Sequence, residues 1–190
     1  GGPVIDLPKG IEHPKGLRFA GQLDLAKFSP FDKTGLLPKT GQLIFFADIM
    51  TDTGKVIYAD VPNDSLIRTI NEHEDNFFLG VLVDKIFADE EVLSDRFREA
   101  EDEWEKEHAN EDGKLWDDFA GSDKSKIFGI YTHCQYGQEE IEKITFSDKI
   151  LLLQVGENGF NDEGVFSVLI SRQDLINKNF DDCEFAWGQS

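Results

Sequence analysis

The longest apolar run in the chain lies at residues 42–48, where every position except the two ends is apolar. An unbroken run of this length is typical of a strand that is buried on both faces. The turn signal Asp52-Thr53-Gly54 follows, and residues 56–59 form the next apolar run. Residues 42–59 therefore predict a β-hairpin.

Shorter apolar runs, bounded by Gly, Pro, Asn and Asp, predict further strands. These strands are expected at residues 17–23, 65–70, 127–131, 150–155, 165–170 and 183–187. Residues 77–83 form another apolar run, which Gly80 interrupts. Residues 1–16 are rich in Pro and Gly, and they predict an extended crossing or a set of turns because proline fixes φ and lacks a backbone N–H.

Helical periodicity is clearest at residues 89–108. Leu93, Phe97, Ala100 and Trp104 are spaced by four, three and four residues, which places them on one face of a helix. The other face is strongly acidic, and we expect it to be solvated; docking of a basic partner is the alternative. Ser171-Arg172-Gln173-Asp174 resembles a capping box and predicts a second, short helix.

Two parts of the chain share one pattern, an apolar strand that ends in a glutamine and an apolar residue. The first copy ends at Gln22-Leu23 and the second at Gln154-Val155. Each continues through a turn-rich loop to a glycine and a second apolar strand. The pattern predicts an α+β fold that is mainly antiparallel β, with two related β units and one acidic amphipathic helix.

The repeat also predicts how one domain is organised over residues 1–190. The two halves are expected at about residues 1–83 and 126–190, joined by a helical segment at 84–125. A chain of this length can bury roughly 70% of its unfolded surface. Sixteen Phe and three Trp supply bulky side chains for a core.

Charge narrows the classes of partner. The chain has 38 acidic and 19 basic residues and a net charge of −19. This sign opposes binding to nucleic-acid phosphates and to anionic membrane surfaces. It favours solubility, and it would also attract a basic protein partner. We therefore expect no nucleic acid and no membrane among the partners.

Cysteine usage and hydropathy favour a cytoplasmic protein. Cys134 and Cys183 are far apart and form no disulfide framework. No run of about 18 apolar residues is present, and no signal peptide is recognisable. The chain opens on Gly1-Gly2 and its only methionine is Met50, so we expect that its natural N-terminus is missing.

In their order and spacing, several short motifs along nearly the whole chain resemble the YwqG-like family of bacterial proteins. The motifs are Leu7-Pro8-Lys9-Gly10, Leu17-Arg18-Phe19 with Gln22-Leu23, Leu37-Pro38, residues 41–48 and 56–60, Phe128-Gly129 with Gln135, residues 151–155, Asp162 with Gly164, and Phe185-Ala186-Trp187. The family is one of unknown function. The resemblance therefore implies a fold and a bacterial origin rather than an activity.

This chain departs from the family pattern at four places. Pro3 follows Gly1-Gly2 one position earlier than is usual in the family. His13-Pro14 stands where the family usually has Trp-Pro, and Phe160-Asn161-Asp162 where it has Trp-Gly-Asp. Trp187-Gly188 stands where it usually has Trp-Asp. If those tryptophans and aspartates form a shared site in the family, this chain has altered it.

Gln22 and Gln154 are the first candidate binding residues, because each lies beside an apolar strand. A buried amide left unpaired costs about 1–3 kcal/mol, so each must find partners. One interpretation is a matched pair that faces a groove between the two halves, with Trp187 nearby. The other is that each amide closes backbone groups of its own hairpin. Gln135 joins the candidates through its place in the family motif.

Other chemistry has weaker support in the sequence. Asp48, Asp52, Asp60 and Asp64 flank the first hairpin, and they predict either solvated strand ends or an acid–base or Mg²⁺ site. The loop at residues 157–164 carries oxygen ligands but lacks EF-hand spacing, so we interpret it as a turn. His133 and Cys134 are adjacent, which directs their side chains apart on a strand. No metal site or cofactor is expected from the motifs.

These observations lead to two hypotheses on function. The preferred one is a non-enzymatic, acidic binding or protein-interaction module that neutralises a basic partner such as a toxin. It depends on the net charge and on the lack of a catalytic motif. The alternative is a metal-dependent hydrolase that uses the aspartates at the hairpin ends.

Overall fold

The computed structural model describes residues 1–80, 83, 85–86, 88, 125–133, 135–136, 138–156 and 164–189. Its strands are β1 Val4–Leu7, β2 Arg18–Asp24, β3 Gln42–Asp48, β4 Thr53–Ala59, β5 Ile67–Ile70, β6 Lys149–Val155, β7 Gly164–Ser171 and β8 Glu184–Gln189. Its helices are α1 Leu25–Phe28, α4 Gln138–Thr145 and α5 Arg172–Asn177, with 3-10 turns η1 Ser29–Phe31, η2 Asn63–Ser65 and η3 Glu74–Asn76. The fold is α+β and mainly antiparallel β, as predicted.

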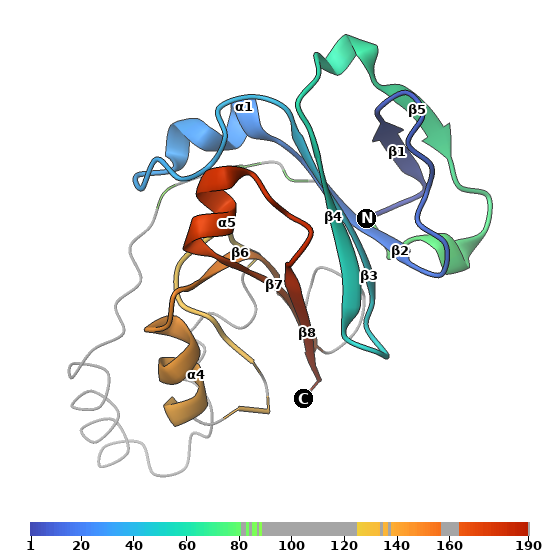
Figure 1. The fold of residues 1–190 in the computed structure, drawn as a ribbon. Coiled ribbons are helices and arrows are strands. Elements are labelled where there is room, and N and C mark those ends of the chain that lie inside the picture. Colours follow the sequence, from blue (N-terminus) through green and yellow to red (C-terminus); the bar gives the residue numbers. More distant parts are fainter. Residues whose placement is uncertain are drawn as a thin grey trace.

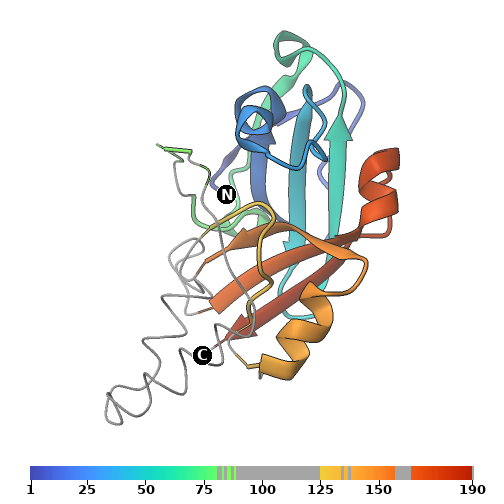
Figure 2. The same ribbon diagram turned by 90° about the vertical axis from the view of Figure 1, so that its left-hand side faces the viewer.

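Two three-stranded sheets form the centre of the molecule. The first has the order β2-β3-β4 and the second the order β6-β7-β8, and all their pairs are antiparallel. The strands of the second sheet cross those of the first at a steep angle (Figure 2). One apolar cluster fills the space between the sheets. This layer is the main core.

A further layer covers the outer face of each sheet. The two-stranded sheet β1-β5 packs on the first sheet through a second apolar cluster that includes Ile5, Leu7 and Phe46. Residues 130–131 and α4 pack on the second sheet through a third cluster. Figure 1 shows β1 and β5 on one side of the molecule and α4 on the other. The central strands β3 and β7 are therefore covered on both faces.

Alternation along β3 explains why its apolar run is unbroken. Leu43, Phe45 and Ala47 belong to the core between the sheets, whereas Ile44 and Phe46 face β1 and β5. Side chains alternate between the two faces of a strand, so a strand with two covered faces needs apolar residues at every position. The prediction that residues 42–48 form a strand buried on both faces is confirmed.

The first strand of each sheet carries a β-bulge at the same distance from its glutamine. In β2 the register shifts between Phe19 and Gly21, and Gln22 follows. In β6 it shifts between Leu151 and Leu153, and Gln154 follows. A bulge adds one residue to a strand and bends it. The two sheets thus share a local geometry, while descent from one duplicated unit stays a prediction.

One predicted strand is absent from the described residues, and two helices, α1 and α4, were not predicted. Residues 127–129 form bends, residues 130–131 belong to no helix or strand, and the preceding Lys126 makes a bridge to Gln154. In the apolar run at residues 77–80, Phe77 makes a bridge to Phe19. The strand prediction for residues 127–131 was wrong, because a short apolar run can also form a segment that covers a sheet. Helix α4 was missed. The predicted helix at residues 89–108 lies outside the described residues.

The short helix α5 begins where the capping pattern predicted. The Ser171 hydroxyl accepts a hydrogen bond from the Asp174 backbone N–H at 3.0 Å and donates to the Asp174 carboxylate at 2.6 Å. This closes the first turn. None of the helices in the described ranges has both the length and the apolar character needed to cross a membrane.

Gly54 and Gly21 give a matched test of the packing between β4 and β8. A Cβ added at Gly54 would lie 2.4 Å from the Phe185 ring and 2.5 Å from the Phe46 carbonyl oxygen, whereas nothing lies within 4 Å of one at Gly21. We expect Gly54→Ala to lower the free energy of unfolding by about 2 kcal/mol or more, because overpacking forces the backbone to shift. Gly21→Ala should leave it unchanged or slightly raised. Urea denaturation measures both, and equal effects would contradict this packing.

Candidate functional site

The candidate site is a cavity of about 220 Å³ on the outer side of the second sheet. Its wall is formed by the loop before β3, the segment before α4, the end of α4, strands β6 and β7, and the start of α5. The lining residues are Thr34, Leu36, Phe128, Gly129, Tyr131, Ile144, Thr145, Ser147, Asp148, Lys149, Ile150, Leu151, Leu169 and Arg172. We call this cavity the α4–β6 pocket.

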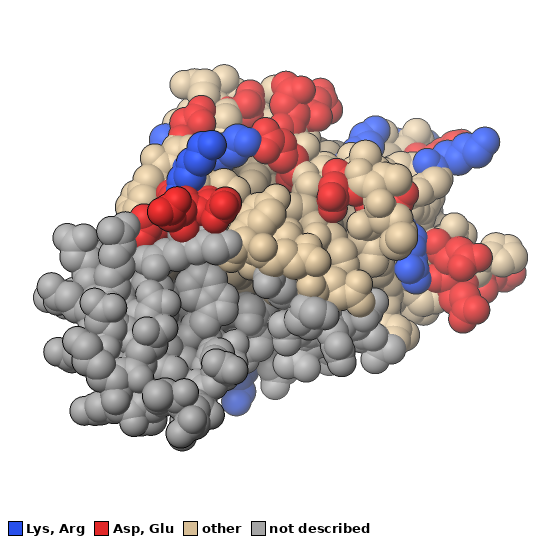
Figure 3. Space-filling model, turned by 90° about the horizontal axis from the view of Figure 1, so that it is seen from below, with Lys and Arg blue, Asp and Glu red and all other residues tan. Residues whose placement is uncertain are grey.

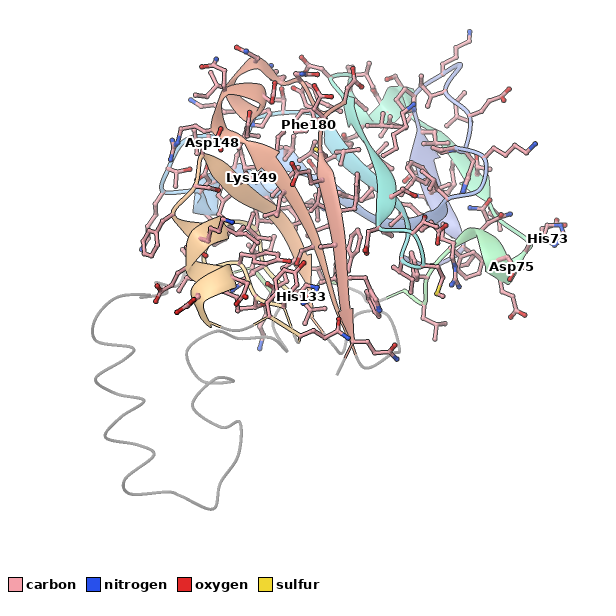
Figure 4. All side chains as sticks on the ribbon, turned by 60° about the horizontal axis from the view of Figure 1, so that its bottom comes forward. His73, Asp75, His133, Asp148, Lys149 and Phe180 are labelled. Atoms are coloured by element: carbon pink, nitrogen blue, oxygen red, sulfur yellow. The ribbon has the colours of Figure 1, made fainter. Side chains whose placement is uncertain are left out.

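Apolar side chains form the floor of the α4–β6 pocket. Tyr131, Leu151 and Leu169 are buried and belong to the cluster under α4. Asp148 and Lys149 lie where the turn after α4 enters β6 (Figure 4). The pocket therefore combines an apolar floor with a polar rim, an arrangement that is common in small-molecule sites.

Several polar groups of the rim already have partners within the protein. The Thr34 hydroxyl donates to Asp32 Oδ1 at 2.6 Å, and the Ser147 hydroxyl donates to the Ile144 carbonyl at 2.7 Å. The Lys149 ammonium forms an ion pair with the Glu184 carboxylate. These groups shape the rim more than they attract a ligand.

Two other polar groups of the pocket are left without such partners. Thr145 Oγ1 is buried and has no hydrogen-bond partner among the described residues. The exposed Arg172 guanidinium forms no ion pair within the described part of the chain. A buried hydroxyl that stays unpaired is costly, so Thr145 has an unmet hydrogen-bonding requirement within the described part of the chain.

Backbone strain occurs on the same wall. Phe128 has φ +64° and Gly129 has φ +84°. A left-handed conformation is uncommon for a bulky residue, and such strain often collects at binding sites. The Phe128 backbone N–H donates to the Leu151 carbonyl at 2.9 Å, which holds this turn against β6.

A known protein family matches nearly the whole chain. Residues 1–188 match the family described as Domain of unknown function (DUF1963). The chain belongs to this family. A comparison with curated proteins finds no match.

In this DUF1963 domain, Gln22 ties the first sheet to β1. Its Oε1 accepts from the Asp6 backbone N–H, and its Nε2 donates to the Asp6 carbonyl, both at 3.1 Å. Nε2 also reaches Gln42 Oε1 at 3.3 Å, and Gln42 donates to Asn63 at 2.8 Å. The amide closes backbone groups of the neighbouring sheet and not of its own hairpin.

Gln154 lies on the opposite side of the molecule from Gln22. It is fully buried and pairs with Ser167 on the face of β7 that points away from the core between the sheets. Its Oε1 accepts from the Thr132 hydroxyl at 2.6 Å. Apolar side chains fill the space between the sheets. The expected groove shared by Gln22 and Gln154 is therefore wrong, while a binding role for either residue stays a prediction.

Trp187 and Gln135 both lie close to His133. The Trp187 side chain packs on the core and fills the space beside Gly164, where a Cβ would lie 2.4 Å from the indole. The Gln135 backbone N–H donates to His133 Nδ1 at 3.2 Å, and its side chain is exposed. Neither residue lines the α4–β6 pocket. Cys134 lies outside the described residues.

The buried His133 ring is held on several sides. The Tyr136 ring stacks on it with the centroids 3.9 Å apart. A Cβ at Gly188 would come within 2.8 Å of the His133 ring, so glycine is needed there. Burial lowers the His133 pKa, against opposing contributions from a backbone hydrogen bond with Trp187 and from the charge of Asp52.

The four aspartates of the first hairpin do not converge. Asp48 accepts from Met50 and Thr51 in the turn, and Asp52 accepts from the Trp187 backbone N–H at 3.0 Å. Asp60 lies 3.8 Å from Lys178, and Asp64 is exposed in η2. Within the described ranges, no group of three or more His, Cys, Asp or Glu residues is placed to hold a metal ion. The loop at residues 157–163 lies outside these ranges.

Sequence reasoning missed the pocket residues Thr145 and Arg172. Arg172 was noticed only as part of the capping pattern, and Thr145 ends a helix that was not predicted. The Phe128-Gly129 pair was the available signal, because it was one of the sequence motifs on which the predicted family resemblance depended. Nothing in the sequence indicates that these positions meet.

Two buried hydroxyls of the DUF1963 domain allow a matched stability test. Both hydroxyls are buried and have no hydrogen-bond partner among the described residues, but Thr145 is a lining residue of the pocket and Ser167 is not. We expect Thr145→Val and Ser167→Ala each to raise the free energy of unfolding by about 1 kcal/mol, because each removes an unsatisfied buried group. Thermal and urea denaturation measure the effect. Destabilisation by Thr145→Val would mean that its hydroxyl has a structural partner.

His133 should make the stability depend on pH. Its native pKa is lowered from the usual value of 6.5, so the unfolded chain binds the proton more readily. The contribution of His133 to stability is then present above pH 6.5 and is lost as the pH falls through the native pKa. We expect His133→Asn to be less sensitive to acid over this range. Urea midpoints at a series of pH values between 5 and 8 test this, and parallel curves for both proteins would contradict it.

Proposed function

We propose that this domain is a non-enzymatic binding module of the YwqG-like type, and that the α4–β6 pocket binds a small carboxylic acid with an apolar body. The observation that carries the proposal is that two residues with unmet polar groups line one pocket with an apolar floor. Among the described residues, the buried Thr145 hydroxyl has no hydrogen-bond partner and Arg172 forms no ion pair. An apolar body would cover Tyr131, Leu151 and Leu169. The carboxylate of the ligand would lie at the polar rim, beside Arg172.

The charges at the rim favour a monoanion. A planar guanidinium such as that of Arg172 matches the two oxygens of a carboxylate. Lys149 is already paired with Glu184, and Asp148 is also among the residues that line the pocket. A phosphate ester would bring about two negative charges beside Asp148. A carboxylate brings one, which Arg172 balances.

The size of the cavity sets a limit on the ligand. Drug-sized ligands occupy pockets of about 300–1,000 Å³, and this cavity measures about 220 Å³. It therefore suits a compact metabolite such as an arylalkanoic acid. The polar rim and the apolar floor of the pocket would hold and orient such a ligand.

A basic protein partner is a second candidate function, favoured by the net charge of −19. On the face shown in Figure 3, the acidic side chains form separate groups with basic side chains among them. The acidic charge on this face is therefore divided among several groups and does not form one continuous patch. The metal-dependent hydrolase has less support, because the described aspartates of the first hairpin lie apart and already serve turns and strand ends.

Binding of 3-phenylpropanoate, compared with its uncharged amide, tests the pocket. We expect the acid to bind more tightly and to raise the melting temperature. Arg172→Met should weaken binding of the acid by about 10- to 100-fold, because it removes a hydrogen bond to a charged group that contributes roughly 1.5–3 kcal/mol. Thr145→Val should weaken it by roughly 3- to 10-fold. Isothermal titration calorimetry measures both.

Controls separate this site from general charge effects. Lys27→Met removes an exposed cation of α1, and Ser167→Ala removes an unpartnered hydroxyl outside the pocket. Neither should change the affinity. Equal loss of affinity in Lys27→Met and Arg172→Met, or equal binding of acid and amide, would overturn the proposal.

A further inference from the structure

Strand β5 is an exposed edge on the side of the molecule away from the α4–β6 pocket. It pairs only with β1, in a sheet of two strands, among the described residues. All four of its residues are exposed, and Ile67 and Ile70 expose 50% and 66% of their surface. In Figure 1, β1 and β5 lie at the periphery of the fold. Unpaired strand edges are sites where a strand from another chain can add.

The pairing with β1 shows which backbone groups of β5 point outward. The Asn71 backbone N–H donates to the Pro3 carbonyl at 2.8 Å, next to the pair Val4 and Ile70. Hydrogen-bonded and non-hydrogen-bonded pairs alternate along an antiparallel ladder. Thr69 and Ile67 therefore bond to β1, while the N–H and C=O groups of Arg68 and Ile70 face away from it.

Charge around this edge specifies the partner. Asp64 precedes β5, and Glu72, Glu74 and Asp75 follow it; all four are exposed and form no ion pair among the described residues. The one cation of the strand, Arg68, is held by Asp6 through contacts at 2.9 and 3.0 Å. Asp75 and the neighbouring His73 project outward at this end of the molecule (Figure 4).

From the free edge and its acidic flanks we infer that β5 receives an extended, basic segment of a partner protein as an added strand. The Arg68 and Ile70 backbone groups would supply the hydrogen bonds, because they are the ones that point outward. Lysine or arginine side chains of the added strand would lie between Asp64 at one end and Glu72 and Glu74 at the other. This surface is independent of the pocket.

The test uses a Lys-Val-Lys-Val-Lys-Val-Lys peptide, its Glu-Val counterpart, and the full chain. We expect only the basic peptide to bind and to slow amide hydrogen exchange at Arg68 and Ile70. Ile70→Pro removes one outward N–H and leaves the ladder to β1 in place, since proline is tolerated at strand edges. It should weaken binding at least 10-fold. The matched variant Ile70→Thr keeps this N–H and should weaken binding less than 3-fold.

A second variant keeps the backbone intact, in case Ile70→Pro disturbs folding. Glu72→Lys combined with Glu74→Lys changes only exposed side chains. It should weaken binding of the basic peptide at least 10-fold and leave the midpoint of urea denaturation unchanged. The inference is overturned if no basic peptide binds. It is equally overturned if Ile70→Pro binds as tightly as the wild type, because the peptide then adheres by charge alone without adding a strand.

Discussion

The apolar layer between the two three-stranded sheets is the constraint on which the rest of the molecule depends. It takes one whole face of each sheet, from Leu43 and Phe45 on one side to Phe166 and Val168 on the other. Because that layer is close-packed, polar chemistry is excluded from the centre. The pocket, the buried histidine and the exposed edge strand all lie on outer faces. A groove between the halves was the natural expectation from a repeated sequence, and the core occupies that place.

A glutamine at the same offset from a bulge connects each sheet to the layer outside it. Gln22 exchanges two hydrogen bonds with the backbone of β1, and Gln154 accepts one from Thr132 in the segment over the second sheet. A bulge bends its strand and re-aims the side chains that follow. Each glutamine amide can therefore make hydrogen bonds to the covering layer while the sheet stays buried beneath it. These hydrogen bonds fix the position of each covering layer on its sheet.

The sequence predicted the central strands well because their environment is uniform along their length. Residues 42–48 are apolar throughout, and their predicted bounds match the strand. Helix α4 was missed because its eight residues contain only two apolar positions, Ile141 and Ile144, which is too little periodicity to detect. The pocket could not be predicted at all. Thr34, Phe128 and Arg172 lie far apart in the chain, and only the packing of the covering layer brings them together.

The tip of the β3–β4 hairpin places an unusual demand on one residue. Asp52 has φ +50° and its carboxylate accepts the Trp187 backbone N–H of the edge strand β8. The position thus needs a left-handed backbone and a short side-chain acceptor together. Glycine meets the first need but not the second, glutamate meets the second at a conformational cost, and only Asp and Asn meet both readily. In relatives that keep this contact between the two sheets, natural variation at position 52 should be confined to that pair.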